Sequence, residues 1–207
     1  MEVAHTPLAG NIDDLPSPRI LNNHLPFGHQ PADLLRKNTK VIFVYRNPKD
    51  VAVSFYYHLK NLHMTGEDID FRSFLQMFVD GLLPSGFYCD YLREWERGIK
   101  ASKDLDILLL SYEDIQKNSL REVEKLSKFL EKSYDEEFLK RVVTATHIDN
   151  MRTAKANPEK PKMSKLYRKG KVGDWKNHFT VADSEWFDRI IRNRMADSDM
   201  FTFEYEL

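Results

Sequence analysis

The chain has 207 residues, which is enough for one domain with a substantial core, and we predict a single domain over residues 1–207. Its composition, 42% hydrophobic and 30% charged, excludes wholesale disorder and a coiled coil. A formal net charge of -1 gives no overall attraction to nucleic acid or to a membrane, and no run of 18 apolar residues is present, so we expect neither partner.

The number of cysteines and the absence of metal-binding motifs exclude further classes of protein. Cys89 is the only cysteine, so an intramolecular disulfide is excluded and a reducing compartment fits best. The N-terminal region has no basic start followed by an apolar stretch, so we expect a soluble, cytoplasmic protein. The sequence contains neither an HExxH motif nor a cysteine cluster, and we expect no metal site.

Residues 1–30 contain four of the nine prolines and little periodicity, which predicts mostly loop, with Arg19–Leu21 as a short strand. His24 follows that strand, at the point where a parallel sheet would present a side chain to a ligand. A histidine in a loop is more often simply exposed or hydrogen-bonded than catalytic, so the local pattern favours no catalytic role for it.

The central feature is the stretch KVIFVYRNPKDVAVSFYYHLKNL at 40–62, which predicts a strand that leads directly into a helix. Asn47 suits the helix cap, and Pro48 suits the first helical position because its missing N–H would have no partner there. Free N–H groups, the positive end of the helix dipole and the guanidinium of Arg46 gather at this junction, and Ser54 adds a hydroxyl two turns into the helix. The junction predicts an anion site, although a surface ion pair between Arg46 and a carboxylate explains the arginine equally well.

Downstream, apolar residues at helical spacing predict helices, and a continuous apolar run predicts a buried strand at 106–112. The helices are expected at 71–79, 87–100, 119–131 and 135–145, with a last one after the capping pattern at 180–183. Strands that alternate with helices indicate a doubly wound α/β sandwich, whose ligands lie beyond the carboxyl ends of its strands. Arg46 and Tyr112 occupy those ends.

Residues 155–176 are strongly basic, with eight Lys or Arg against only Glu159 and Asp174, and we predict a mobile basic loop over about 155–173. Its centre, Arg168-Lys169-Gly170, combines two cations with a residue that lets the backbone approach a phosphate closely. A solvated run of charge is the commoner explanation of such a segment. A nucleic-acid patch is a third explanation, which one short basic loop in a slightly acidic chain supports only thinly.

Four stretches, taken in order, resemble the cytosolic sulfotransferase family over nearly the whole chain. They are SPRILNNHLP at 17–26, KVIFVYRNPKDVAVSFYYH at 40–58, SYEDI at 111–115 and RKGKVGDWKNHFT at 168–180. The family transfers a sulfuryl group from 3'-phosphoadenosine 5'-phosphosulfate (PAPS) to a small molecule such as a phenol, alcohol, sterol or amine. The resemblance implies a three-layer α/β sandwich with a central parallel sheet, of the P-loop NTP hydrolase type.

The resemblance also implies roles for particular residues. His24 would be the general base, and the 3'-phosphate of the nucleotide would be held by Arg46, Ser54, Arg168, Lys169 and Gly170. The remaining nucleotide contacts would come from Tyr112 at the adenine and from the segment that contains Thr146, Ile148 and Met151, in which Ile148 stands where the family commonly has phenylalanine. A homodimer would form through the KxxxTVxxxE residues Lys176, Thr180, Val181 and Glu185, although a capped helix with an exposed flank explains the same residues.

Two departures from the family pattern bear on activity. The family's first strand and its phosphosulfate-binding loop of the YPKSGTTW type have no counterpart, so we expect a domain that is incomplete at its N-terminus and exposes apolar sheet surface. Asn22 replaces the lysine that precedes the base by two positions, which removes a cation near the transferring group. The alternatives to an active enzyme are a catalytically impaired remnant that binds nucleotide or dimerises, and a fragment that does not fold alone.

Overall fold

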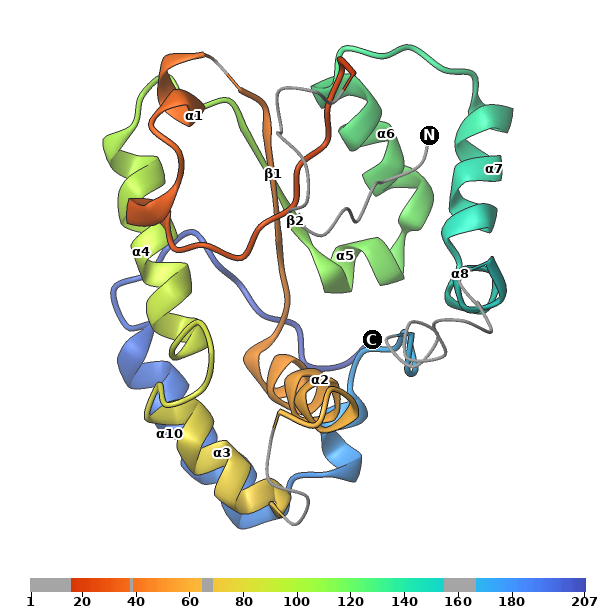
Figure 1. Ribbon diagram of the computed structural model, residues 1–207. Coiled ribbons are helices and arrows are strands. Elements are labelled where there is room, and N and C mark those ends of the chain that lie inside the picture. The colour runs from red at the N-terminus through yellow and green to blue at the C-terminus, as the bar shows by residue number, and fades with distance from the viewer. Residues whose placement is uncertain (1–15, 38, 65–68, 155–166) are drawn as a thin grey trace.

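The computed structural model describes residues 16–37, 39–64, 69–154 and 167–207 (Figure 1). Two strands are present in these residues, β1 (Val41–Tyr45) and β2 (Ile107–Ser111). The helices are η2 (Phe27–His29), α1 (Asp33–Arg36), α2 (Pro48–Asn61), α3 (Phe71–Val79), α4 (Tyr88–Ala101), α5 (Tyr112–Lys117), α6 (Ser119–Phe129), α7 (Glu136–Thr146), α8 (Ile148–Ala154), η3 (Asp174–Asn177) and α10 (Val181–Arg194). None of the helices in the described part of the chain is long and apolar enough to cross a membrane.

The two strands form a parallel sheet, in register from Val41 opposite Ile107 to Tyr45 opposite Ser111. Parallel strands need a crossover connection, and α2, α3 and α4 supply it. Figure 1 shows α4 on one side of the strands and α5 and α6 on the other. The predicted α/β class with a parallel sheet is therefore confirmed.

The short strand predicted at Arg19–Leu21 is wrong. In the structure this stretch is irregular, and Ile20 and Leu21 are each 58% exposed. A strand needs a neighbour for its N–H and C=O groups, and among the residues described only β1 and β2 pair with one another. A run of three residues with two apolar side chains is therefore not enough to form a strand here.

The strand predicted at 106–112 ends at Ser111, and α5 begins at once with Tyr112. The hydroxyl of Ser111 accepts the N–H of Asp114 at 3.3 Å and so caps this unpredicted helix. Ser111 and Asp114 have the spacing of an N-cap and a third helical residue, which is the sequence signal that could have revealed α5. Tyr112 therefore lies in the first turn of a helix instead of at the end of a strand.

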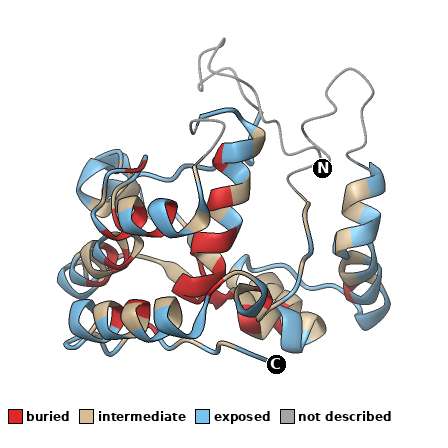
Figure 2. Cartoon of the chain, turned by 90° about the horizontal axis from the view of Figure 1, so that it is seen from below, coloured by how far each residue is buried: buried red, intermediate tan, exposed pale blue. Residues whose placement is uncertain are grey.

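Two apolar clusters hold these elements together. Figure 2 marks in red the buried stretches of the chain. The larger one lies between α2, α3 and α10 and is rich in aromatic rings, of which Phe74 and Phe187 are fully buried. The smaller one packs Phe43 and Tyr45 of β1 against Trp95 of α4 and against Phe201 near the C-terminus. Because aromatic pairs at ring separations of 4.7–6.4 Å fill both clusters, the helices on this side of the sheet are rigidly placed.

The opposite face of β1 is not covered in the same way. Ile42 and Val44 alternate with the buried residues of β1 and are 41% and 56% exposed. Side chains of a strand point alternately to the two faces of its sheet, so one apolar row faces α4 and the other remains accessible. The second apolar row of β1 is therefore partly accessible to solvent.

Candidate functional site

The site begins where β1 passes into α2, as the sequence predicts. Asn47 is the N-cap of α2, and its side-chain oxygen accepts the N–H of Asp50 at 2.8 Å. Glu113 of α5 accepts the backbone N–H and the side-chain amide of Asn47, both at 2.9 Å. Pro48 occupies the first helical position. The junction is thus fixed by buried polar contacts and presents Arg46 at its mouth.

Arg46 is anchored through both its backbone and its guanidinium. Its N–H donates to the hydroxyl of Tyr88 at 3.0 Å, and that hydroxyl donates to the carbonyl of Arg46 at 3.2 Å. Burial raises the pKa of Tyr88 well above its usual range, so the phenol keeps the proton that it donates. One guanidinium nitrogen of Arg46 donates to the carbonyl of Lys171 at 2.6 Å and lies 3.0 Å from a carboxylate oxygen of Asp50. The guanidinium carbon lies 4.1 Å from the centre of the Tyr112 ring.

This geometry resolves one of the alternatives that the sequence leaves open. Arg46 does pair with a carboxylate, but Asp50 is only 1% exposed, so the pair is not a solvated surface contact. The Nε atom of Arg46 is buried and has no hydrogen-bond partner among the described residues. Arg46 itself is half-buried, and a guanidinium that is held by the protein while part of it stays accessible can still donate to an anion.

The segment 167–177 forms the second half of the site. Gly170 has a positive φ of 66°, and a Cβ atom there would lie 2.8 Å from the side chain of Ile148. Only glycine therefore allows this loop to pack against the start of α8. Arg152 of α8 fastens the same loop, because it donates to the carbonyls of Tyr167 and Arg168 at 3.1 and 3.0 Å. The interpretation of the whole basic segment as a mobile loop concerns residues 155–166 as well, which lie outside the described part of the chain.

Asp174 pairs with two cations of this segment, Arg168 and Lys169, and fixes their orientation. Its carboxylate lies 2.6 Å from both the guanidinium of Arg168 and the ammonium of Lys169, and it accepts the amide of Asn177 at 2.8 Å. The ring nitrogen of His178 lies 3.3 Å from the same carboxylate. Asp174 is only 5% exposed, so it holds Arg168 and Lys169 from the buried side of the segment. Both cations also line the cavity.

We expect the free energy of unfolding of the Asp174→Asn variant to fall less steeply than that of wild type as the pH is lowered. Burial raises the pKa of Asp174, but hydrogen bonds from Lys169, Asn177 and Arg168 outweigh it and hold the pKa well below its usual 3.8. Such a carboxylate stabilises the fold above the unfolded pKa, and this contribution is lost as the pH falls towards the folded value. Between about pH 5 and about pH 2, wild type should lose about 2 kcal/mol more unfolding free energy than the variant. Urea unfolding at each pH measures this, and equal losses would contradict it.

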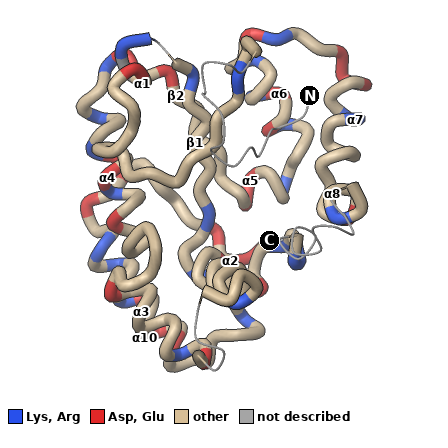
Figure 3. The backbone as a smooth tube through the Cα atoms, in the orientation of Figure 1, with Lys and Arg blue, Asp and Glu red and all other residues tan. Residues whose placement is uncertain are grey.

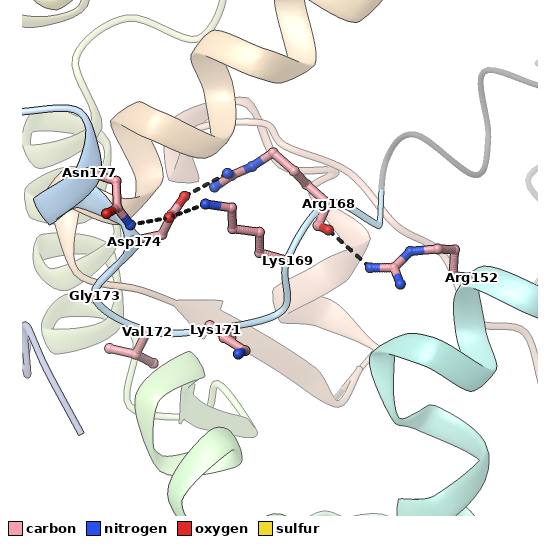
Figure 4. A pocket seen from close by; sticks show the side chains of 8 residues that line it. All are labelled: Arg152, Arg168, Lys169, Lys171, Val172, Gly173, Asp174 and Asn177. Atoms are coloured by element: carbon pink, nitrogen blue, oxygen red, sulfur yellow. Dashed lines mark hydrogen bonds and ion pairs between the residues drawn. The ribbon is translucent and has the colours of Figure 1, made fainter.

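Charges of both signs are interspersed over the helices of the described part (Figure 3). The cavity beside α8 and the 168–177 segment is different, because cations dominate its lining (Figure 4). Its volume is about 490 Å³, and it is lined by Arg152, Arg168, Lys169, Lys171, Val172, Gly173, Asp174 and Asn177. A hollow in which four of the eight lining residues are Lys or Arg is suited to a phosphate or a sulfate group.

The structure brings together part of the residues that the sequence singles out. Arg46 meets the 168–171 segment through the carbonyl of Lys171, Tyr112 lies under the Arg46 guanidinium, and Ile148 lies against Gly170. Burial raises the pKa of Tyr112, which keeps this phenol neutral.

Other predicted residues lie outside this cluster of contacts. Ser54 is exposed on α2 and does not line the cavity. Thr146 is exposed, and its hydroxyl donates to the carbonyl of Val142 within α7 at 2.8 Å. Met151 is half-buried on α8. The sequence did not single out Arg152, Asp50 or Asp174 as site residues, because their roles depend on partners that are distant in the chain.

His24 lies in the irregular segment before η2 and is exposed. Its two neighbours are fixed. The side chain of Asn23 accepts from Leu25 N–H at 3.0 Å and from Gln30 at 3.1 Å, while Trp95 of α4 donates to the carbonyl of Leu25 at 3.3 Å. His24 therefore lies between two anchored neighbours and is itself exposed to solvent.

The KxxxTVxxxE residues lie along η3 and the start of α10. Thr180 and Asp183 form a reciprocal capping box, as their spacing predicts. Lys176 pairs with Glu206 near the C-terminus, and Val181 is 78% exposed. An exposed valine flanked by a rigid helix cap suits a small contact between two copies and also suits a simple helix end.

Comparison with known proteins adds independent information. A family model described as the sulfotransferase domain matches residues 7–199. Amine sulfotransferase from Oryctolagus cuniculus is 36% identical over 198 residues, which make up 90% of this chain and 64% of that protein. Sulfotransferase 1E1 from Homo sapiens is 37% identical over 201 residues, which make up 91% of this chain and 66% of that protein. The chain thus spans about two thirds of the length of these curated relatives.

A solved structure agrees with the sequence match. The crystal structure of mouse sulfotransferase SULT7A1 complexed with PAP has a TM-score of 0.79 and 27% identity, and the match covers 90% of this chain and 69% of that one. The sequence motifs, the family model, the curated relatives and the solved structure agree, and the chain belongs to the sulfotransferase family.

Proposed function

We propose that the chain binds PAPS and serves sulfuryl transfer from it to a hydroxyl or amine of a small molecule. The observation that carries this proposal is the meeting of Arg46 with the Arg168–Lys171 segment, through a 2.6 Å hydrogen bond between residues 125 positions apart. We assign the 3'-phosphate of the nucleotide to Arg46, Ser54, Arg168, Lys169 and Gly170. The PAP bound to the mouse relative supports an adenosine bisphosphate as the occupant.

We assign the adenine side of the nucleotide to the residues that flank these cations. Tyr112 offers a half-buried ring beside Arg46, and Ile148 lies at the turn of Gly170. Thr146 and Met151 bracket Ile148 on α7 and α8. Ile148 would supply an apolar contact without the stacking that a phenylalanine offers.

The proposed chemistry is an in-line transfer. His24, as a neutral imidazole, takes the proton of the acceptor while the acceptor's oxygen or nitrogen forms a bond to sulfur. The bond from sulfur to the 5'-phosphate breaks at the same time, and adenosine 3',5'-bisphosphate leaves with the electron pair. Alignment and charge stabilisation dominate such a reaction, as they do in phosphoryl transfer. The cations at the 3'-phosphate anchor the nucleotide, and the resemblance assigns the 5'-phosphosulfate to a loop that this sequence does not match.

The remaining parts of the proposal concern acceptor, assembly and location. The acceptor class is a phenol, alcohol, sterol or amine, and the name of the relative from Oryctolagus cuniculus supports amines. A homodimer through Lys176, Thr180, Val181 and Glu185 would bury the exposed valine. The single cysteine supports a cytoplasmic location.

A transfer assay with radiolabelled PAPS and a panel of phenols, alcohols, sterols and amines tests this function. We expect label to move to at least one acceptor class. A folded chain that transfers no label to any of these classes would contradict the enzymatic proposal.

A second candidate is a protein that binds the nucleotide without transferring sulfate. Asn22 in place of the family's lysine favours it, because that position bears on the sulfuryl group and is not one of the proposed 3'-phosphate contacts. Calorimetry with adenosine 3',5'-bisphosphate separates the two candidates. Binding without transfer supports this second candidate, and no binding by a folded chain contradicts both.

A further inference from the structure

Asp50 is a buried carboxylate of the site that contacts both of its halves, although it does not line the cavity. It is the third residue of α2 and is 1% exposed. One of its oxygens accepts from the side chain of Asn47 at 3.0 Å and from the backbone N–H of Gly173 at 2.8 Å, and lies 3.0 Å from Arg46. The other oxygen accepts the backbone N–H of Trp175 at 3.0 Å.

These contacts exceed what an acidic residue at this helix position requires. A third-position carboxylate commonly turns back to the N–H groups of its own helix start. Asp50 instead accepts from residues 123 and 125 positions downstream. Burial of a carboxylate is costly unless it is fully paired, and here the pairing comes from both halves of the cation site.

We propose that Asp50 is the positioning residue that holds the two cationic halves of the 3'-phosphate site in register; this inference rests on the proposed function. Asp50 contacts Arg46 directly in one half. In the other half it holds the N–H groups on either side of Asp174, and Asp174 in turn orients Arg168 and Lys169. Asp50 therefore acts with the direct hydrogen bond from Arg46 to the carbonyl of Lys171 to set the spacing between Arg46 and the cations Arg168 and Lys169.

The substitution Asp50→Asn isolates this role. Asparagine has nearly the same shape and keeps one acceptor oxygen, but its NH₂ group would face donors, whether Arg46 and Gly173 or Trp175. The segment around Trp175 keeps another support from the same turn of α2. Lys49 is 3% exposed, lies 4.2 Å from the centre of the Trp175 ring and donates to Asp188 of α10 at 2.8 Å.

The test compares two ligands that differ only in the 3'-phosphate. Dissociation constants for adenosine 3',5'-bisphosphate and adenosine 5'-phosphate are measured by ligand-observed NMR with wild type, Asp50→Asn and Glu122→Gln. Glu122 is a matched control, because it is a carboxylate 3% exposed and paired with Arg121 and Lys125 on α6, away from the cavity. We expect Asp50→Asn to weaken binding of the bisphosphate at least about tenfold and to leave the monophosphate and the control unchanged.

The outcomes separate this inference from the proposed function. Wild type that does not prefer the bisphosphate overturns the proposed function. Wild type that prefers it, together with an Asp50→Asn variant that keeps the same preference, overturns only the role of Asp50. Equal weakening of both ligands by Asp50→Asn also overturns that role, since it reports general damage to the fold.

A measurement on wild type keeps the inference testable if Asp50→Asn does not fold. Hydrogen exchange at the amides of Gly173 and Trp175 reports how firmly Asp50 holds them. We expect adenosine 3',5'-bisphosphate to slow both amides more than adenosine 5'-phosphate does. Exchange that the two nucleotides affect equally, in a chain that prefers the bisphosphate, would overturn the proposal.

Discussion

Arg46→Gln should weaken binding of adenosine 3',5'-bisphosphate by about 100-fold, because the substitution removes a charge-assisted contact and the delocalised fork of donors that suits a phosphate. Glutamine ends near the position of the arginine Nε, so the 2.6 Å hydrogen bond from the terminal guanidinium nitrogen to the carbonyl of Lys171 is lost as well. It leaves Asp50 without its guanidinium partner, which adds an unpaired buried charge to the loss.

Calorimetric titration measures this effect, and Arg97→Gln is the matched control. Arg97 is an exposed arginine of α4 whose guanidinium donates within its own helix, to the carbonyl of Arg93 at 3.3 Å. Its substitution should leave the dissociation constant unchanged. If Arg46→Gln behaves like Arg97→Gln, the assignment of the 3'-phosphate to Arg46 is wrong.

His24→Ala should lower the rate of sulfuryl transfer at saturating PAPS by about 10²–10⁴-fold, the range typical of a lost general base. The imidazole is exposed and lies between two anchored neighbours, so its removal should alter neither the fold nor nucleotide binding. The expected signature is therefore a loss of turnover number with an unchanged dissociation constant for adenosine 3',5'-bisphosphate.

His29→Ala controls for the loss of a histidine from the same region. His29 is exposed at the end of η2, five positions after His24. We expect this variant to transfer sulfate at the wild-type rate. Activity that survives His24→Ala, or an equal loss in His29→Ala, would exclude His24 as the base.

The parts of the fold that the sequence predicts well are those governed by local patterns. The junction at 40–62 combines a β-branched run, a capping asparagine and a proline, and all three signals favour the same strand-to-helix turn. The capping box at Thr180 is another local signal that the structure confirms. At Ser111-Tyr112 two local signals compete. The apolar run predicts a strand through Tyr112, whereas Ser111 is the N-cap of the helix α5, which is not among the predicted helices.

The site was only partly predictable, for a different reason. Cations and glycine at 168–170 can be recognised in the sequence, but the carboxylates that orient them cannot. Asp50 meets its partners across 123 and 125 positions, and Asp174 is an ordinary member of a charged run until its burial is known. Long-range pairing of buried charges leaves no periodic trace, so only the structure reveals it.

The most direct test of the central claim is a crystal structure of the chain with adenosine 3',5'-bisphosphate. We expect the 3'-phosphate between the guanidinium groups of Arg46 and Arg168, at the edge of the cavity of about 490 Å³ that Arg168 lines, and within hydrogen-bond distance of both. We also expect Asp50 to keep its contacts with Gly173 and Trp175 in that complex. A nucleotide bound with its 3'-phosphate away from Arg46 and Arg168 would contradict the account.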